Sequence, residues 1–271
     1  MGLALVQQML PILAKMKWPS NTQPTLAGHK TFEVGVDKVD DYHGDPKELG
    51  AALRTFQTAD SRPYALAGAA YTLLAASRND DGSYVQEGLD ASLSLLEQAQ
   101  ETAPDVADIN MIEAHIYVYS NRLDDARLVL NYLQGQDPHN YYIHRAELAY
   151  WIAQDDLDQS IRWCKKTMSV AKELPQRLRL QSIMGDLYAR QGATQMALQA
   201  YQKAAHFDPE NPIIWNKIAE AYFELDNLKE ASRYNERALA MKRFPAAMET
   251  RARIQSRLET TGNLRDRLFR S

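Results

Sequence analysis

The stretch that decides the fold of this chain is residues 181–209, QSIMGDLYARQGATQMALQAYQKAAHFDP. Its spacing predicts two helices packed against each other, with an aromatic residue on the first, Tyr188, and a small residue on the second, Ala197. A small residue lets two helix backbones approach closely, and a bulkier one would clash. Asp208–Pro209 predicts the end of the second helix, because proline disfavours helical backbone in the residue before it.

The same spacing recurs along the chain. An aromatic series, with gaps of 46, 34, 37 and 34 residues, comprises Tyr71, Tyr117, Trp151, Tyr188 and Tyr222. A series of small residues, with gaps of 34, 34, 37 and 34, comprises Ser92, Ala126, Ser160, Ala197 and Ala231. A third series has the same gaps as the second and comprises Ala99, Leu133, Thr167, Ala204 and Ala238. All three series share a spacing of 34 residues and the same later gap of 37 residues, which indicates an internal repeat.

The stretch 181–209 resembles a tetratricopeptide repeat, which is a helix pair that stacks on copies of itself. The resemblance rests on the order of seven residues, Gly185, Tyr188, Gly192, Ala197, Tyr201, Ala204 and Pro209. The resemblance covers about residues 61–244, five copies. It implies an all-α, right-handed superhelical solenoid, and Ala246–Glu259 would cap its last hydrophobic face, as solenoids require. We therefore expect an N-terminal extension (1–60), a repeat array (61–244), and a capping helix with a trailing basic end (245–271).

The N-terminal extension has mixed patterning. Residues 2–17 predict an amphipathic helix, with a kink or a break at Pro11, which cannot donate the hydrogen bond to Gln7. Residues 19–31 have the composition of a linker, and the acidic stretch 32–46 is expected to be extended in part. A second helix is predicted over Pro46–Gln57, with Pro46 in its first turn.

Composition and charge limit the function classes. The chain has 271 residues, 45% of them apolar, and no apolar run approaches the roughly 18–20 residues of a membrane-spanning helix. Lys15 and Lys17 follow the first apolar stretch, the reverse of a secretory signal, so we expect a cytoplasmic protein. Cys164 is the single cysteine; it cannot form an internal disulfide and is predicted to be a buried helix residue.

The net charge of −4 is unevenly distributed. Residues 242–271 contain eight Arg or Lys against three Asp or Glu, whereas the rest of the chain is acidic. Arginines on a terminal helix are usually solvated, and an acidic body repels a phosphate backbone, so nucleic acid is disfavoured as a partner.

The sequence contains no recognisable catalytic or cofactor-binding constellation. It has no GxGxxG and no phosphate-binding loop, and His139 and His144 lack a cysteine or a set of acidic ligands nearby. We expect neither catalytic activity nor a cofactor or metal ion.

The faces of the first helices opposite the aromatic series predict an inner groove, apolar at its first end and charged at its last. Its expected floor comprises Leu66, Ala69, Leu73, Ile112, Tyr142, Ala146, Ala149, Ala153, Ile183 and Glu224, together with the partner-binding candidates. Those candidates are His115, Tyr119, Tyr142, Arg145, Arg179, Asp186, Arg190, Asn216, Lys217 and Glu220. For His115, Tyr119 and Tyr142 ordinary packing is the alternative.

These features favour a non-enzymatic scaffold that binds a peptide or protein in the groove. Some tetratricopeptide-repeat proteins hold a peptide carboxylate with lysine, asparagine and arginine side chains; Leu66, Ala69, Met111 and Ile112 replace such donors here, which disfavours that ligand. An apolar floor requires a cover, and the N-terminal segment of the same chain or of a second copy is the candidate, which would allow a homo-oligomeric scaffold. Alternatively, helix 2–17 anchors the chain to a membrane surface, although two lysines attract anionic lipid weakly.

Overall fold

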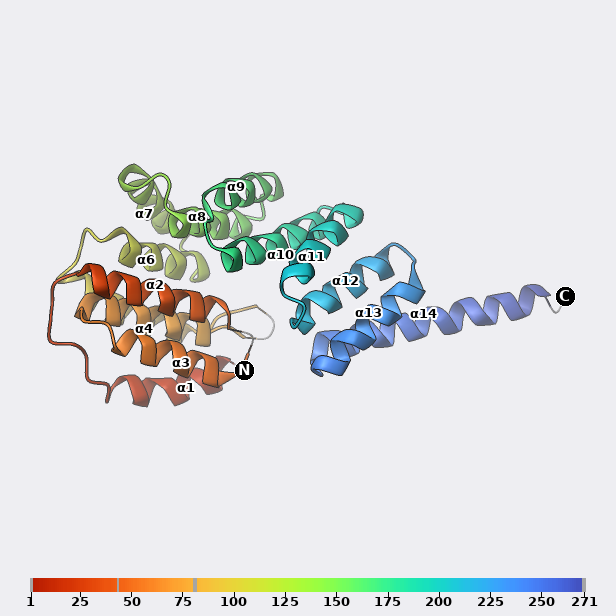
Figure 1. The fold of residues 1–271 in the computed structure, drawn as a ribbon, viewed down its shortest axis with the longest axis horizontal. Coiled ribbons are helices and arrows are strands. Elements are labelled where there is room, and N and C mark those ends of the chain that lie inside the picture. The colour runs from red at the N-terminus through yellow and green to blue at the C-terminus, as the bar shows by residue number, and fades with distance from the viewer. Residues whose placement is uncertain (1, 43, 80–81, 270–271) are drawn as a thin grey trace. The chain divides into compact units, whose positions relative to one another are not determined.

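The computed structural model describes residues 2–42, 44–79 and 82–269, with side chains as far as residue 260. Within these ranges every regular element is an α-helix, and one isolated bridge joins Arg78 and Tyr84. The helices, drawn in Figure 1, are α1 Gly2–Leu13, α2 Leu26–Asp40, α3 Pro46–Gln57, α4 Arg62–Ala76, α5 Gln86–Gln100, α6 Ala107–Tyr119, α7 Leu123–Gln136, α8 Tyr141–Ala153, α9 Leu157–Val170, α10 Leu174–Arg190, α11 Thr194–Phe207, α12 Pro212–Glu224, α13 Leu228–Met241 and α14 Pro245–Phe269.

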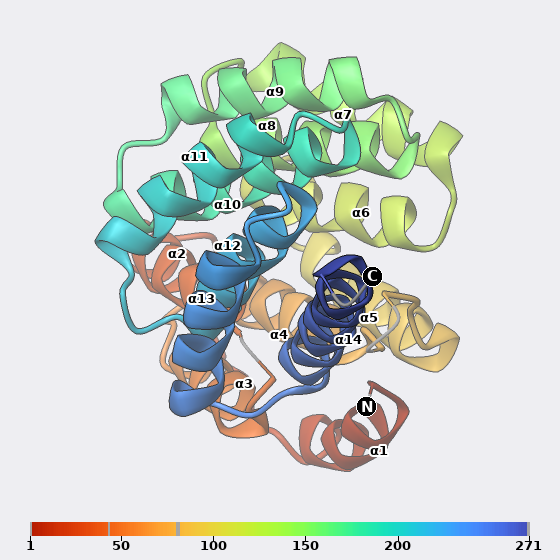
Figure 2. The same cartoon turned by 90° about the vertical axis from the view of Figure 1, so that its right-hand side faces the viewer.

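The chain folds as two compact units, which divide between Asp155 and Asp156. In the first unit α2 packs on α3, α4 on α5, and α6 on α7, and α8 contacts α6 and α7. Helix α4 is central, because it contacts α1, α2, α3, α5 and α6 (Figures 1 and 2). The contacts therefore show the predicted helix pairs that begin with α4 and α6, and they add an earlier pair, α2 and α3.

The segment expected to be linker and partly extended chain is largely helix α2, and that expectation is wrong. Thr25 begins the helix as its N-cap, with a side chain that accepts a hydrogen bond of 2.9 Å from the Gly28 amide. Phe32, Val36 and Val39 are buried, and their spacing of four and three residues forms one helical face. The acidic residues Glu33, Asp37 and Asp40 flank this face and are only partly exposed, and this acidic flank hid the periodicity in the sequence.

Helix α1 is shorter than expected and is not broken. It ends at Leu13, and Pro11 lies in its last turn, so only the hydrogen bond to the carbonyl of Gln7 is lost. Leu5, Val6, Met9 and Leu13 are buried, whereas Leu3 and Ile12 are exposed, and α1 contacts α4 and α5. The prediction that the N-terminal segment packs on the following helices is thereby confirmed, and the covered helices belong to the same chain.

In the second unit α10 pairs with α11 and α12 with α13, while α9 contacts α10, and α14 contacts α12 and α13. Left-handed backbone at Gly192 (φ 77°) and Asp226 (φ 56°) reverses the chain between the helices of each pair. Asn227 caps the beginning of α13, since its side chain accepts a hydrogen bond of 3.3 Å from the Glu230 amide. The terminal helix is longer than expected, because α14 continues from Pro245 to Phe269.

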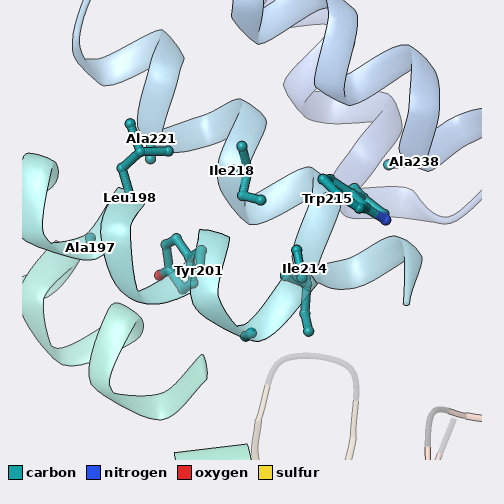
Figure 3. Close-up of a cluster of buried hydrophobic side chains, with 10 residues drawn as sticks. Ala197, Leu198, Tyr201, Ile214, Trp215, Ile218, Ala221 and Ala238 are labelled. Carbon is teal, nitrogen blue, oxygen red and sulfur yellow. The ribbon is translucent and has the colours of Figure 1, made fainter. Parts of the chain in front are cut away.

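Small residues of α11 and α13 allow the close packing of the second unit. Figure 3 shows Ala197, Leu198 and Tyr201 of α11 facing Ile214 and Ile218 of α12 in one cluster of buried side chains. The predicted small-residue positions Ala197, Ala204, Ala231 and Ala238 are all fully buried. These positions match the spacing expected from the sequence, so the helix register of this unit follows from its small residues.

Candidate partner-binding face

The inner positions predicted for the first unit are filled by the chain itself. Five apolar members of that set, Leu66, Ala69, Leu73, Ile112 and Ala146, are fully buried, whereas Ala149 is partly exposed and Ala153 is exposed at the end of α8. Helix α4 is surrounded so completely that all its residues except Arg62 and Ala75 are buried. The expectation that the apolar floor is covered is correct, and the cover consists of neighbouring helices of this chain.

Three aromatic candidates from the first unit also lie in packed surroundings. His115 is 3% exposed, and its ring stacks on Tyr119, which stacks in turn on Tyr84. Within the described residues neither ring nitrogen of His115 has a hydrogen-bond partner, and burial lowers the pKa of the imidazole to about 4. Tyr142 is 6% exposed. This geometry favours the packing alternative for these side chains.

Arg145, one of the predicted partner-binding residues, is buried. Its guanidinium contacts the Asp40 carboxylate through Nη1 and donates to the Tyr71 hydroxyl through Nη2. Tyr71 completes the triangle by donating a hydrogen bond of 2.6 Å to Asp40. Arg145 thus ties α8 to α2 and α4 and has no open surface for a partner.

A second polar contact holds α2 against the inner side of the first unit. His29 Nε2 lies 2.9 Å from Asp108 Oδ2 at the beginning of α6. Asn140, the N-cap of α8, donates a hydrogen bond of 3.2 Å to the other carboxylate oxygen of Asp108. The hydrogen bond to Asp108 is the main reason that the pKa of His29 is raised.

The second unit presents charged side chains on its first helices, and we define its polar face as Ser182, Asp186, Lys217, Glu220, Glu224, Thr250 and Arg253. Lys217 on α12 donates to both carboxylate oxygens of Asp186 on α10, over 2.7 and 2.6 Å. The hydroxyl of Tyr201 donates to the same carboxylate over 2.8 Å. Burial and the neighbouring carboxylate raise the pKa of Tyr201, so this hydroxyl keeps its proton and stays a donor.

A second hydrogen-bonded group links α12 to α14. Asn216 and Thr250 both donate to Glu220 Oε1, over 2.8 and 2.9 Å. Asn216 is buried and accepts a hydrogen bond of 3.0 Å from Asn235. Because two donors fix one carboxylate oxygen, the orientation of Glu220 is set by protein contacts rather than by solvent.

The end of the polar face lies on α14. Arg253 forms an ion pair of 2.7 Å with Glu224, and its guanidinium lies 4.6 Å from the centre of the Phe223 ring. Both charged side chains are about half exposed, with 45% for Arg253 and 55% for Glu224. They are therefore accessible to an incoming chain.

The structure brings together four of the predicted charged and polar candidates, namely Asp186, Lys217, Asn216 and Glu220. Arg179 and Arg190 lie on the same side of α10 as Asp186 by helical spacing, with Arg179 partly exposed and Arg190 exposed.

Sequence reasoning missed Thr250, Arg253 and Asn235, because α14 was regarded only as a cap. A signal for Thr250 existed, since Ser182, Asn216 and Thr250 are separated by 34 residues each.

The remaining reactive groups are Cys164 and the side chains that could ligate a metal ion. Cys164 is fully buried in α9, and burial raises the pKa of its thiol to about 12, which suppresses the nucleophilic thiolate. Among the residues that the structure describes, no three His, Cys, Asp or Glu side chains are placed to hold a metal ion. None of the described helices combines the length and the apolar character needed to cross a bilayer.

Comparison with known proteins supports the repeat on the second unit. Residues 185–226, from the middle of α10 to the turn after α12, match the family model described as TPR repeat. No curated protein sequence gives a match.

The fold recurs in 201 matching chains of solved structures. A chain of the APC/C hetero-tetramer Cut9–Hcn1 is similar with a TM-score of 0.62 and 12% identity, over 84% of this chain and 46% of that chain. Pseudomonas aeruginosa pilF has a TM-score of 0.55 and 13% identity, over 64% and 78% of the two chains. TTC0263, described as a thermophilic TPR protein in Thermus thermophilus, has a TM-score of 0.50 and 21% identity, over 64% and 92%. At these identities the similarity concerns the fold alone.

Proposed function

We propose that this chain, which has the fold of tetratricopeptide-repeat proteins, is a non-enzymatic scaffold that binds a protein segment along its polar face. The observation that carries the proposal is the contrast between the two units. Most of the predicted inner side chains of the first unit, from Leu66 to Ala146, are buried against their own chain. In the second unit Asp186, Lys217, Glu224 and Arg253 are at least partly exposed, and they form the ion pairs Asp186–Lys217 and Glu224–Arg253.

The chemistry of the polar face suits a polypeptide. It carries both donors, such as Lys217 and Arg253, and acceptors, such as Asp186 and Glu224, and an extended chain with mixed side chains offers the complementary groups. Its ion pairs are inexpensive to rearrange, because the Asp186 and Lys217 side chains are 43% and 24% exposed and an exposed pair contributes only about 0.2–1 kcal/mol. A partner can therefore replace these contacts with its own at a small cost in free energy.

The alternative functions lose the surface that they would need. A membrane tether requires the apolar side of α1, but Leu5, Val6, Met9 and Leu13 of that side are buried against the first unit. Assembly through the N-terminal segment requires α1 or α2 to cover a second copy, and both helices pack on their own chain. These contacts favour the scaffold over the two alternatives.

Site-specific photocrosslinking in the full chain tests the proposal. A benzophenone side chain is placed at Glu224 or Arg190, which are exposed on first helices, and at Lys203, which is exposed on α11, as the control. We expect the first two positions to capture the same protein and the third to capture none. The double variant Arg179→Glu, Arg190→Glu should abolish capture from position 224 without loss of helicity. Equal capture from position 203, or capture that survives the double variant, would refute the polar face as the binding surface.

A further inference from the structure

Helices α13 and α14 border an open groove that the polar face does not include. The groove encloses about 410 Å³, and its apolar lining consists of Leu239 and Ala240 from α13 and Met248 and Ala252 from α14. Met248 is 56% exposed, which is high for a large apolar side chain on a packed helix. The groove therefore has the apolar floor that a docking helix requires.

The position of the groove in the repeat indicates what fits there. Helix α10 is flanked by the second helices α9 and α11, and α12 is flanked by α11 and α13. Helix α14 packs on α12 and α13, but within the described residues no second helix lies on its other side. By the pattern of the repeat, the groove therefore lies where a second helix would pack on α14, if α14 is the first helix of a pair.

Charge decides between the possible occupants. Arg243 and Arg251 line the groove, and neither has a hydrogen bond or an ion pair in the part of the chain that the structure describes. Glu236, the acidic residue of the lining, accepts a hydrogen bond of 3.0 Å from Ser232. The groove therefore offers two positive charges beside an apolar floor, and carboxylates on an incoming helix would complement them.

The same charges disfavour the occupants that this chain itself supplies. A second copy that met the groove through the same face would bring two more arginines to it. Residues 263–269 contain two arginines against one aspartate and would also add positive charge. Like charges brought together in an interface cost free energy, so neither occupant is favoured.

We propose that the groove between α13 and α14 binds an amphipathic helix of another protein, with small and apolar residues on its buried side and glutamate or aspartate along its flanks. The bound helix packs on α14 as α13 packs on α12. Its carboxylates pair with Arg243 and Arg251.

Helix α13 supplies a probe for the test, because it is the second helix that packs on α12, the preceding first helix. One stapled, fluorescent peptide has its sequence, LKEASRYNERALAM, and the other carries glutamate in place of Lys229, Arg233 and Arg237. Fluorescence anisotropy with the full chain should show binding of the glutamate peptide at least tenfold tighter than that of the parent peptide. The preference should weaken as salt is added, because salt screens exposed charges.

Variants of the full chain locate the binding. Charge reversal by Arg243→Glu with Arg251→Glu should remove the preference for the glutamate peptide, whereas Arg162→Glu on the exposed side of α9 should leave it unchanged. Filling the groove by Ala252→Trp should reduce binding of both peptides at least tenfold, with circular dichroism as the check on folding.

Three results would overturn the proposal. The first is equal binding of the two peptides, or binding that the double reversal does not change. The second is a dimer in sedimentation that Ala252→Trp dissociates, because a second copy would then fill the groove. The third is binding that occurs only after removal of residues 263–271, because the chain's own end would then be the occupant.

Discussion

The ring of Tyr201 on α11 occupies the space beside Gly185 on α10 in which any side chain at position 185 would begin. A methyl group at Gly185 would overlap the ring carbons of Tyr201, and the Tyr201 hydroxyl is also held by Asp186. We expect Gly185→Ala to lower the free energy of unfolding by about 1–3 kcal/mol in urea titration, because the ring must move. In the control Gly135→Ala the new methyl group meets nothing within 4 Å, and stability should stay level or rise. Equal losses in both variants would contradict this account.

Ala197 tests the close approach of α10 and α11. It is fully buried, so Ala197→Leu adds volume where none is available and should cost about 1–3 kcal/mol in thermal or urea unfolding. Ala189→Leu adds the same atoms on the exposed side of α10 and should cost little. If Ala197→Leu is as stable as Ala189→Leu, the packing of these helices differs from that described above.

The buried ion pair of Arg145 and Asp40 allows a test in the first unit. Arg145→Met removes one partner and leaves the carboxylate in surroundings where its side chain is 7% exposed. Loss of one member of a buried pair costs about 3–5 kcal/mol, which urea unfolding would measure. The double variant Arg145→Met, Asp40→Leu should recover part of that loss, because no buried charge remains. A double variant less stable than the single variant would show that the pair contributes more than charge compensation.

His115 predicts an acid-side loss of stability. Its pKa of about 4 in the folded chain lies below the ordinary 6.5, so as pH falls below about 6.5 the unfolded chain takes up a proton and the folded chain does not. The stability that the neutral His115 contributes to the folded chain is fully present above pH 6.5. Up to about 3 kcal/mol of the free energy of unfolding is lost as the pH falls toward 4. We expect His115→Phe to flatten the pH profile of urea midpoints over this range, while His139→Gln at an exposed site leaves it unchanged.

His29 predicts the opposite dependence. Its pKa is raised by Asp108, so the stability it contributes is present below pH 6.5 and is lost as pH rises through the raised value. A double-mutant cycle with His29→Asn and Asp108→Asn should give a coupling of about 0.2–1 kcal/mol at pH 5.5 and a smaller coupling at pH 9. A coupling that is the same at both pH values would assign the contact to packing alone.

The second unit could be predicted from sequence to a large extent because its repeats keep one spacing. The small residues Ala197 and Ala231 lie, fully buried, where the pattern placed them. In this unit local propensity and packing agree, so a sequence pattern is sufficient.

The first unit departs from the prediction because its contacts are distant in sequence. The ion pair between Asp40 and Arg145 joins residues 105 positions apart, and that between His29 and Asp108 joins residues 79 apart. No periodicity in a single sequence indicates such contacts. Helix α2 was missed for a related reason, because its buried face consists of only a few apolar residues within an acidic stretch.

The burial of α4 on almost every side implies an unusual pattern of mutational tolerance. In a scan of all single substitutions, an ordinary surface helix such as α13 should show tolerated positions that recur every three or four residues, because one side of it faces water. Along α4 no such periodicity is expected, and substitutions should be poorly tolerated at every position from Pro63 to Leu74. Natural sequence variation in this protein is therefore expected to be lowest in its fourth helix, which belongs to the unit that carries neither proposed binding surface.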